Sequence, residues 1–262
     1  MSNIYEALEQ AQREKNDSDI PPLITVLEEK QPKKKTRAKD SRLSEKTSEN
    51  NTTLSMEAEM FCLFQNIECL LPDSPEKTIL FIGPQGDEGV STIVSEFARM
   101  AAVRLNKTVL IMDAAHHNPS QHMYFDIKGC YGWKDAMGDR DTIDKAYYKA
   151  SNANVFLSPI FPGPALIPQV YDHSAAISFL EELKDKFDLV LIDSSPAITS
   201  PDSMAISRFT DGVVLVMEAE RTRMHVIESV KNKIERNGGK ILGIILNKRK
   251  VYIPDFIYKR LH

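Results

Sequence analysis

The residues best suited to chemistry form one short stretch of this chain. Residues 79–92 read I-L-F-I-G-P-Q-G-D-E-G-V-S-T, an apolar strand followed by a glycine-rich turn and a helix opened by Ser91 and Thr92. This layout points main-chain N–H groups and the positive end of a helix at an anion. A phosphate-binding loop usually ends G-K-[ST], where the lysine reaches the β/γ-phosphates and the hydroxyl binds Mg²⁺. Here Gly89 and Ser91 are in place but Val90 replaces the lysine, so the sequence predicts a nucleotide site without its catalytic ammonium group.

Two aspartates that end apolar strands can join this loop. Asp113 closes the run V-L-I-M-D, and Asp193 closes D-L-V-L-I-D. A carboxylate beside a phosphate loop suits Mg²⁺, which takes oxygen ligands, although a single aspartate there is also a common helix cap. We therefore predict ATP or ADP with Mg²⁺, bound weakly, with Asp113 and Asp193 as catalytic residues and with Ser91 as a third metal ligand. The predicted nucleotide-binding residues are Gly83, Gly86, Asp87, Glu88, Gly89, Val90, Ser91 and Thr92.

The elements that must position these residues alternate along the chain. Near-continuous apolar runs predict strands that are covered on both faces, and helical spacing fills the gaps between them. Strand–helix alternation predicts an α/β fold with a doubly wound, mostly parallel sheet flanked by helices, which binds ligands beyond the carboxyl ends of its strands. The predicted strands are 78–83, 108–113, 154–157, 188–193, 212–217 and 241–247, and the predicted helices are 91–105, 175–186, 202–209 and 223–237.

The 262 residues are predicted to divide into three parts. Residues 1–15 have the apolar spacing of a short amphipathic helix, which alone is marginal in water. Residues 16–55 are polar and charged and are predicted to be a disordered basic linker, with eight basic and two acidic residues between Lys30 and Lys46. Such a run can contact anionic lipid or nucleic acid but is more often a solvated linker. Helical apolar spacing resumes at Met56, so residues 56–262 are predicted to form the folded domain.

Composition narrows the class of protein. The net charge is −4, and 42% of the residues are hydrophobic, yet the longest apolar runs are strand-sized and far from the ~20 residues of a membrane-spanning helix. The opening M-S-N-I-Y-E-A-L has no signal-peptide pattern, and the three cysteines lack metal-ligand spacing. We expect a cytoplasmic protein with reduced cysteines. No zinc, Ser-His-Asp or nucleic-acid motif is present, so no nucleic-acid partner is expected.

From about Glu57 onward the sequence resembles the bacterial tyrosine kinases (BY-kinases) of capsule and exopolysaccharide loci, of the P-loop NTPase superfamily. The matching motifs are G-P-Q-G-D-E-G-V-S-T, V-L-I-M-D-A-A-H-H-N-P-S, F-D-L-V-L-I-D-S-S-P, D-G-V-V-L-V-M-E-A-E-R-T-R and G-I-I-L-N-K-R-K-V-Y-I-P-D-F-I-Y-K-R-L. The opening M-S-N-I-Y-E-A-L also resembles the start of exopolysaccharide-linked members. The resemblance implies a MinD-like and BY-kinase-like fold and a tyrosine-kinase ancestry.

Departures from the family pattern concentrate on catalysis and assembly. The family's second motif reads D-x-D with an arginine two residues on, where the first aspartate helps to hold the metal and the second activates the attacking tyrosine. Here Asp113 is kept, but Ala115 and His117 stand at the other two positions. The leading helix lacks the E-x-x-R-x-x-R motif that packs family members into a ring. The family's tyrosine-rich tail is reduced to Tyr252 and Tyr258, which are the candidate phospho-acceptors.

These departures lead to three functional hypotheses. The first is a pseudokinase of exopolysaccharide synthesis, a regulatory partner of a membrane-anchored chain-length determinant or of a homologous active kinase. It would be cytoplasmic and peripheral at the inner membrane through that partner, with self-oligomers also open. The second is an active tyrosine autokinase in the same pathway, with a relocated positive charge. The third, ranked last, is a ParA/MinD-type positioning ATPase, because Gln85 stands where such proteins carry an early lysine.

The sequence also gives expectations for the place of a few other residues. Lys248, Arg249 and Lys250 follow the last predicted strand and could approach the phosphate loop, although this region more often faces the nucleotide base. His116 and His117 are expected to be surface or loop histidines and not metal ligands. Trp133 is expected to pack in or beside the core.

Overall fold

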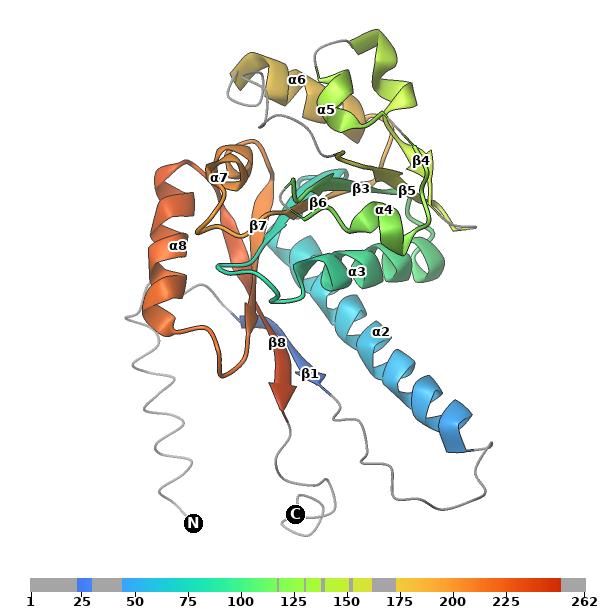
Figure 1. The fold of residues 1–262 in the computed structure, drawn as a ribbon, viewed down its shortest axis with the longest axis vertical. Helices are drawn as coiled ribbons and strands as arrows, with labels where there is room; N and C mark the ends of the chain where they lie inside the picture. The colour runs from blue at the N-terminus through green and yellow to red at the C-terminus, as the bar shows by residue number, and fades with distance from the viewer. Residues whose placement is uncertain are drawn as a thin grey trace.

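The computed structural model describes residues 23–29, 44–116, 118–129, 131–137, 140–150, 153–161 and 173–250. Its centre is an eight-stranded sheet with the order β1-β8-β7-β2-β6-β3-β5-β4, parallel except for the pairing of β4 with β5 (Figure 1). The strands are β1 (Leu23–Glu29), β2 (Lys77–Ile82), β3 (Val109–Ala114), β4 (Tyr148–Lys149), β5 (Val155–Ser158), β6 (Leu189–Ser194), β7 (Gly212–Glu218) and β8 (Ile241–Lys250).

Helices cover both faces of this sheet. They are α2 (Ser44–Leu70), α3 (Val90–Arg104), α4 (Gln121–Tyr124), α5 (Trp133–Ala136), α6 (His173–Lys184), α7 (Pro201–Ser207) and α8 (Met224–Arg236), with a 3₁₀ turn η2 (Arg140–Lys145). The doubly wound α/β prediction is confirmed, and all six predicted strands and four predicted helices are present. Short elements such as β4 and α4 were not predicted, because two to four residues carry no readable periodicity.

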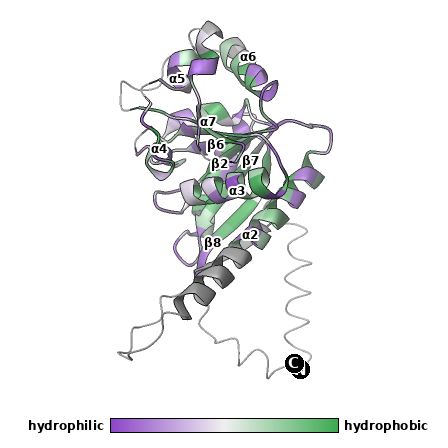
Figure 2. Ribbon diagram, turned by 90° about the vertical axis from the view of Figure 1, so that its right-hand side faces the viewer, coloured by the Kyte–Doolittle hydropathy of each residue, from purple (hydrophilic) through white to green (hydrophobic). Residues whose placement is uncertain are grey.

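The sheet residues alternate between two hydrophobic clusters. In β2, Ile79 and Phe81 pack with α2 and α3 on one face, whereas Leu80 and Ile82 pack with α6, α7 and α8 on the other. All six residues of β2, β3 and β6 are buried, which is why these strands read as continuous apolar runs. Figure 2 shows the hydrophobic strands between helices that carry both hydrophobic and hydrophilic residues.

The predicted linker over residues 16–55 is wrong in two places. Leu23–Glu29 forms β1, which pairs in parallel with β8 at the edge of the sheet, and α2 begins at Ser44, well before the expected boundary. The run L-I-T-V-L is rich in β-formers and can complete the open hydrogen-bonding edge of β8. The polar residues before Met56 continue the same helix, because its hydrogen bonds are internal and need no apolar side chains. The expected helix over residues 1–15 lies outside the described residues.

Candidate functional site

The glycine-rich turn lies between β2 and α3, at the carboxyl end of the central strand. Asp87 and Gly89 have left-handed backbones, with φ values of 66° and 88°. A side chain at Gly89 would be doubly unfavourable, since its Cβ would also lie 2.3 Å from Nδ2 of Asn247. That Asn247 amide donates a 2.8 Å hydrogen bond to the carbonyl of Glu88. The end of β8 therefore holds the loop in shape.

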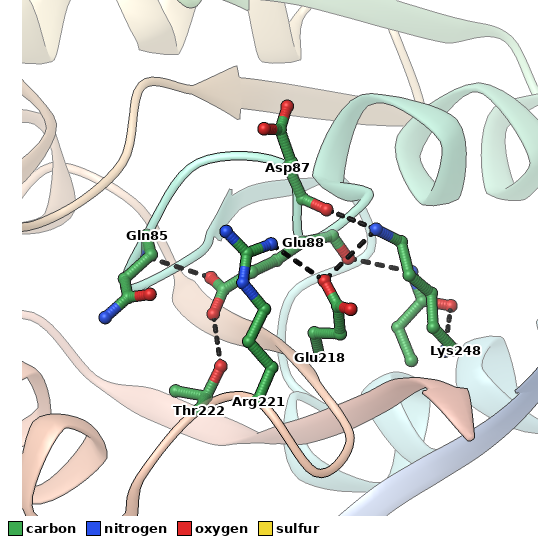
Figure 3. A network of polar contacts seen from close by, with 8 residues as sticks. Gln85, Asp87, Glu88, Glu218, Arg221, Thr222 and Lys248 are labelled. Carbon is green, nitrogen blue, oxygen red and sulfur yellow. Dashed lines mark hydrogen bonds and ion pairs between the residues drawn. The ribbon is translucent and has the colours of Figure 1, made fainter. Parts of the chain in front are cut away.

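Glu88 braces the loop from within. Its side chain is 1% exposed; Oε2 accepts a hydrogen bond from the Gln85 N–H at 3.0 Å, and Oε1 accepts one from the Thr222 hydroxyl at 2.6 Å (Figure 3). Burial raises the pKa of this carboxyl, and the two hydrogen bonds oppose the rise. The sequence grouped Glu88 with the phosphate-binding residues, but its carboxylate is engaged by the loop's own amide and by Thr222.

A cavity of about 430 Å³ opens over this loop at the start of α3. Val90, which stands at the lysine position, is partly buried and packs against the hydrophobic cluster shared by α2 and α3. The cavity is lined by Gly83, Gln85, Gly86, Asp87, Glu88, Gly89, Val90, Ser91, Thr92, Ala115, Asn118, Ser120, Ser194, Ser195, Pro196 and Lys248.

The two predicted aspartates meet beside this cavity. Asp113 of β3 and Asp193 of β6 are register partners on adjacent parallel strands, and both are fully buried. Burial raises the pKa of both carboxyls, and the charge of Asp113 raises the pKa of Asp193 further. Parallel strands bring their carboxyl ends to one edge of a sheet, so the predicted convergence of the loop with both aspartates is what the structure shows.

Gln121, the first residue of α4, was missed by the sequence reading. Its Nε2 donates to Oδ2 of Asp193 at 2.8 Å and to the carbonyl of Ser91 at 3.0 Å, and its main-chain N–H donates to Oδ2 of Asp113 at 3.2 Å. Its Oε1 accepts a 2.8 Å hydrogen bond from the Ser95 hydroxyl. One glutamine in a four-residue helix gives no local signal, so only the tertiary contacts identify it.

The oxygen atoms at this edge fit a hard divalent cation. Oδ1 of Asp193 is buried without a hydrogen-bond partner, while the Ser91 hydroxyl is hydrogen-bonded to the same carboxyl group. Two carboxylates and a hydroxyl are the ligands that Mg²⁺ takes when phosphates complete its shell. Ser91, Asp113 and Asp193 would hold the ion, which would supply charge neutralisation for the phosphates. Within the described residues, no group of three or more His, Cys, Asp and Glu side chains forms a separate metal site.

This chain has no carboxylate at the position of the family's second aspartate. Ala115 lines the cavity, is 8% exposed, and donates its main-chain N–H to Oδ1 of Asp113 at 3.0 Å. His116 next to it lies 3.5 Å from the carboxylate of Asp202. Trp133 is buried, as expected, and its Nε1 donates a 2.7 Å hydrogen bond to the carbonyl of Asp113.

Some residues of interest in the sequence lie outside the described residues. His117, the counterpart of the family arginine, lies outside the described residues, as do Cys130, Tyr252 and Tyr258. Cys62 and Cys69 are free thiols on the exposed side of α2. Across the part of the chain that the structure describes, no helix has the length and hydropathy needed to cross a bilayer.

Lys248 brings a positive charge to the loop from the end of β8. Its Nζ contacts the carbonyl of Asp87 and lies 3.2 Å from Oε2 of Glu218. The same Glu218 oxygen accepts a 2.9 Å hydrogen bond from Arg221, so one carboxylate is shared by two cations (Figure 3). The approach of this region to the phosphate loop, left open by the sequence, is what the structure shows for Lys248.

Comparison with known proteins supports the resemblance seen in the motifs. No family model matches the chain. The tyrosine-protein kinase CpsD of Streptococcus agalactiae is 30% identical over 166 residues, which is 62% of this chain and 70% of CpsD. Among solved structures, the kinase domain of the Escherichia coli tyrosine kinase ETK has a TM-score of 0.73 over 89% of this chain and 92% of that domain, at 16% identity.

A second group of structures shares the fold more distantly. The septum site-determining protein MinD of Pyrococcus horikoshii, solved in complex with Mg-ADP, has a TM-score of 0.53 over 65% of this chain and 70% of its own, at 20% identity. This likeness and that of ETK show the fold alone, whereas the similarity to CpsD is a similarity of sequence that covers 70% of CpsD. The chain belongs to the bacterial tyrosine-kinase family.

Proposed function

We propose that this chain binds ATP or ADP with Mg²⁺ in the loop cavity and acts as a catalytically impaired regulatory member of its family. It serves exopolysaccharide or capsule biosynthesis from the cytoplasm, held at the inner membrane by a membrane-anchored chain-length determinant. A homologous active kinase, or a second copy of this chain, is a further partner.

The observation that carries this proposal is the environment of Val90. An apolar side chain packed on the core stands where the loop needs an ammonium group, and Ala115 stands where the family pattern has its base. Phosphoryl transfer depends on positioning and on neutralising charge. Losing one charge-stabilising donor commonly costs about 10²–10³ in rate, and losing a general base about 10²–10⁴. The effects within one site are not additive, but either one leaves a poor kinase.

Nucleotide binding is less affected by these replacements. The loop still surrounds a cavity at the start of α3, and the unpartnered oxygen of Asp193 lies at the same strand edge. Main-chain amides at a helix start can bind phosphate, and the replacement of a side chain does not remove them. The complex of the fold relative MinD with Mg-ADP is consistent with a nucleotide at this place.

Support for the pathway comes from the family alone. CpsD is a tyrosine-protein kinase, and the resemblance of the motifs is to members from capsule and exopolysaccharide loci. The basic run between Lys30 and Lys46 is compatible with a location near an anionic membrane.

A titration with Mg-ADP and Mg-ATP tests the nucleotide site. We expect Val90→Lys to bind about tenfold more tightly than the wild type, because a charge-assisted hydrogen bond to phosphate is worth roughly 1.5–3 kcal/mol. Val90→Met is the matched control, since it adds length without charge and should leave the affinity within about twofold. Equal affinity of all three proteins would contradict the role given to the missing lysine.

Incubation with labelled ATP and Mg²⁺, with and without the chain-length determinant from the same locus, tests the loss of catalysis. We expect tyrosine labelling at least ~100-fold below that of an active family member. Robust labelling would favour the alternative, an active autokinase, for which the position of Lys248 is the supporting observation. In that case, phosphate should appear on Tyr252 or Tyr258 in cells lacking other such kinases and should be lost in Asp193→Ala.

A further inference from the structure

We propose that Lys248 is the phosphate-binding cation of this nucleotide site and takes the place of the side chain lost at Val90. The inference rests on the proposed nucleotide binding and names the residue that contacts the β- or γ-phosphate. It concerns binding and does not supply the missing base.

Lys248 lies where a phosphate-binding cation is needed. Lys248 is the only positively charged residue among those lining the cavity, within the described part of the chain. Its Nζ already contacts the carbonyl of Asp87, inside the turn that would surround a phosphate. The chain reaches this place at the end of β8 and not at the start of α3, so the charge comes from a different element than the one that carries Val90.

The backbone around Lys248 is held in place by hydrogen bonds of Asn247. Lys248 has a left-handed φ of 56°, which is uncommon for a residue with a side chain. Its N–H is held at 2.9 Å by Oδ1 of Asn247, whose Nδ2 binds the carbonyl of Glu88. One asparagine therefore ties the phosphate loop to the end of β8, where Lys248 lies.

Without a ligand, Lys248 makes an ion pair with Glu218 that it can release. Glu218 lies 3.2 Å from its Nζ and accepts a hydrogen bond from Arg221 at 2.9 Å (Figure 3). The Lys248 side chain is 33% exposed, and partly exposed ion pairs are weak. When a phosphate attracts Lys248, Arg221 can keep Glu218 neutralised, so releasing the lysine leaves no unpaired carboxylate. The flexible stem of a lysine allows this movement without a change in the backbone.

The test is a titration of the full chain with Mg-ADP and Mg-ATP. Lys248→Met keeps the apolar stem and removes the charge, and we expect its affinity to fall about tenfold or more. Lys248→Arg should retain affinity within about threefold. Arg249→Ala, the neighbouring exposed cation, is the matched control and should bind like the wild type. Urea denaturation of each variant confirms that it is folded.

Two further variants make the inference specific. Glu218→Gln should bind nucleotide more tightly than the wild type, because Lys248 is no longer held by a carboxylate. In a Val90→Lys background, Lys248→Met should lose less affinity than in the wild type, because two cations would then serve the same phosphates.

The outcomes separate this inference from the proposed function. Binding by the wild type with equal binding by Lys248→Met overturns the role of Lys248 alone. A wild type and a Val90→Lys variant that both fail to bind nucleotide overturn the proposed function, and the role of Lys248 with it. A fall in Arg249→Ala equal to that in Lys248→Met would show only a general charge effect and would also overturn the assignment.

Discussion

Thr222 and Glu88 join the phosphate loop to the turn after β7 through one hydrogen bond of 2.6 Å. Replacing Thr222 by valine removes the hydroxyl donor and keeps the branched shape of the side chain. Glu88 is buried, with 1% of the residue exposed, so its carboxylate has little access to water, and the Gln85 N–H is the hydrogen-bond donor that remains. The perturbation therefore leaves a buried carboxylate with one hydrogen bond fewer.

The expected loss of stability depends on pH. A hydrogen bond to a charged group is worth about 1.5–3 kcal/mol, and one to a neutral group about 0.5–1.5 kcal/mol. Burial already raises the pKa of Glu88, so ionising this residue costs stability as the pH rises from its unfolded pKa through its folded pKa. Removing the Thr222 donor raises the pKa of Glu88 further, and the loss should therefore be larger at pH 8 than at pH 5.

Urea denaturation of wild type and Thr222→Val at pH 5 and pH 8 measures this difference. Thr199→Val is the control, because the Thr199 hydroxyl makes a 3.3 Å bond in an exposed turn and its loss should change stability by less than about 0.5 kcal/mol. A cost for Thr222→Val that is the same at both pH values, or no greater than that of the control, would refute the bracing role of Glu88.

Three other predictions concern substitutions that change buried contacts. Asp193→Asn should stabilise the metal-free protein by about 1.4 kcal/mol or more at pH 8 and little at pH 4. The reason is that burial raises the pKa of Asp193, and a shift of one pKa unit is worth about that amount. Urea denaturation in EDTA between pH 4 and pH 8 checks this, and a gain in stability that does not depend on pH would contradict it. Trp133→Phe should lower the free energy of unfolding, measured by urea denaturation, by about 1–3 kcal/mol, because the buried carbonyl of Asp113 loses its indole donor. Gly132→Ala should lower the free energy of unfolding by about 1–3 kcal/mol or more, since its Cβ would lie 1.9 Å from the carbonyl oxygen of Pro159, and an unchanged melting temperature would show that this loop can move aside.

Some of the site could be predicted from the sequence because its signals are local. The strands that end at Asp113 and Asp193 are fully buried, so they read as unbroken apolar runs with a carboxylate at the end. In a parallel sheet these ends share one edge, which brings both aspartates to the loop at Gly89. Local pattern and sheet topology were therefore sufficient to predict that both aspartates lie beside the loop.

Other parts had no local signal. The sequence did not distinguish Glu88 from the other residues of the loop. Its hydrogen bond to Thr222, which is 134 positions away, forms only in the folded structure. Gln121 contacts Asp193 across 72 positions from a helix too short to be read. The strand Leu23–Glu29 was hidden in a polar segment, because its place depends on the free edge of β8.

The sequence by itself determined the buried strands, the phosphate loop, the absent lysine at Val90 and the family, because each depends on the order of neighbouring residues. Only the tertiary structure decided that Lys248 meets the loop at Asp87 and shares Glu218 with Arg221. The physical reason is that charges far apart in the chain are brought together by the sheet order and by the left-handed backbone at Lys248, and neither feature can be read from the neighbouring residues.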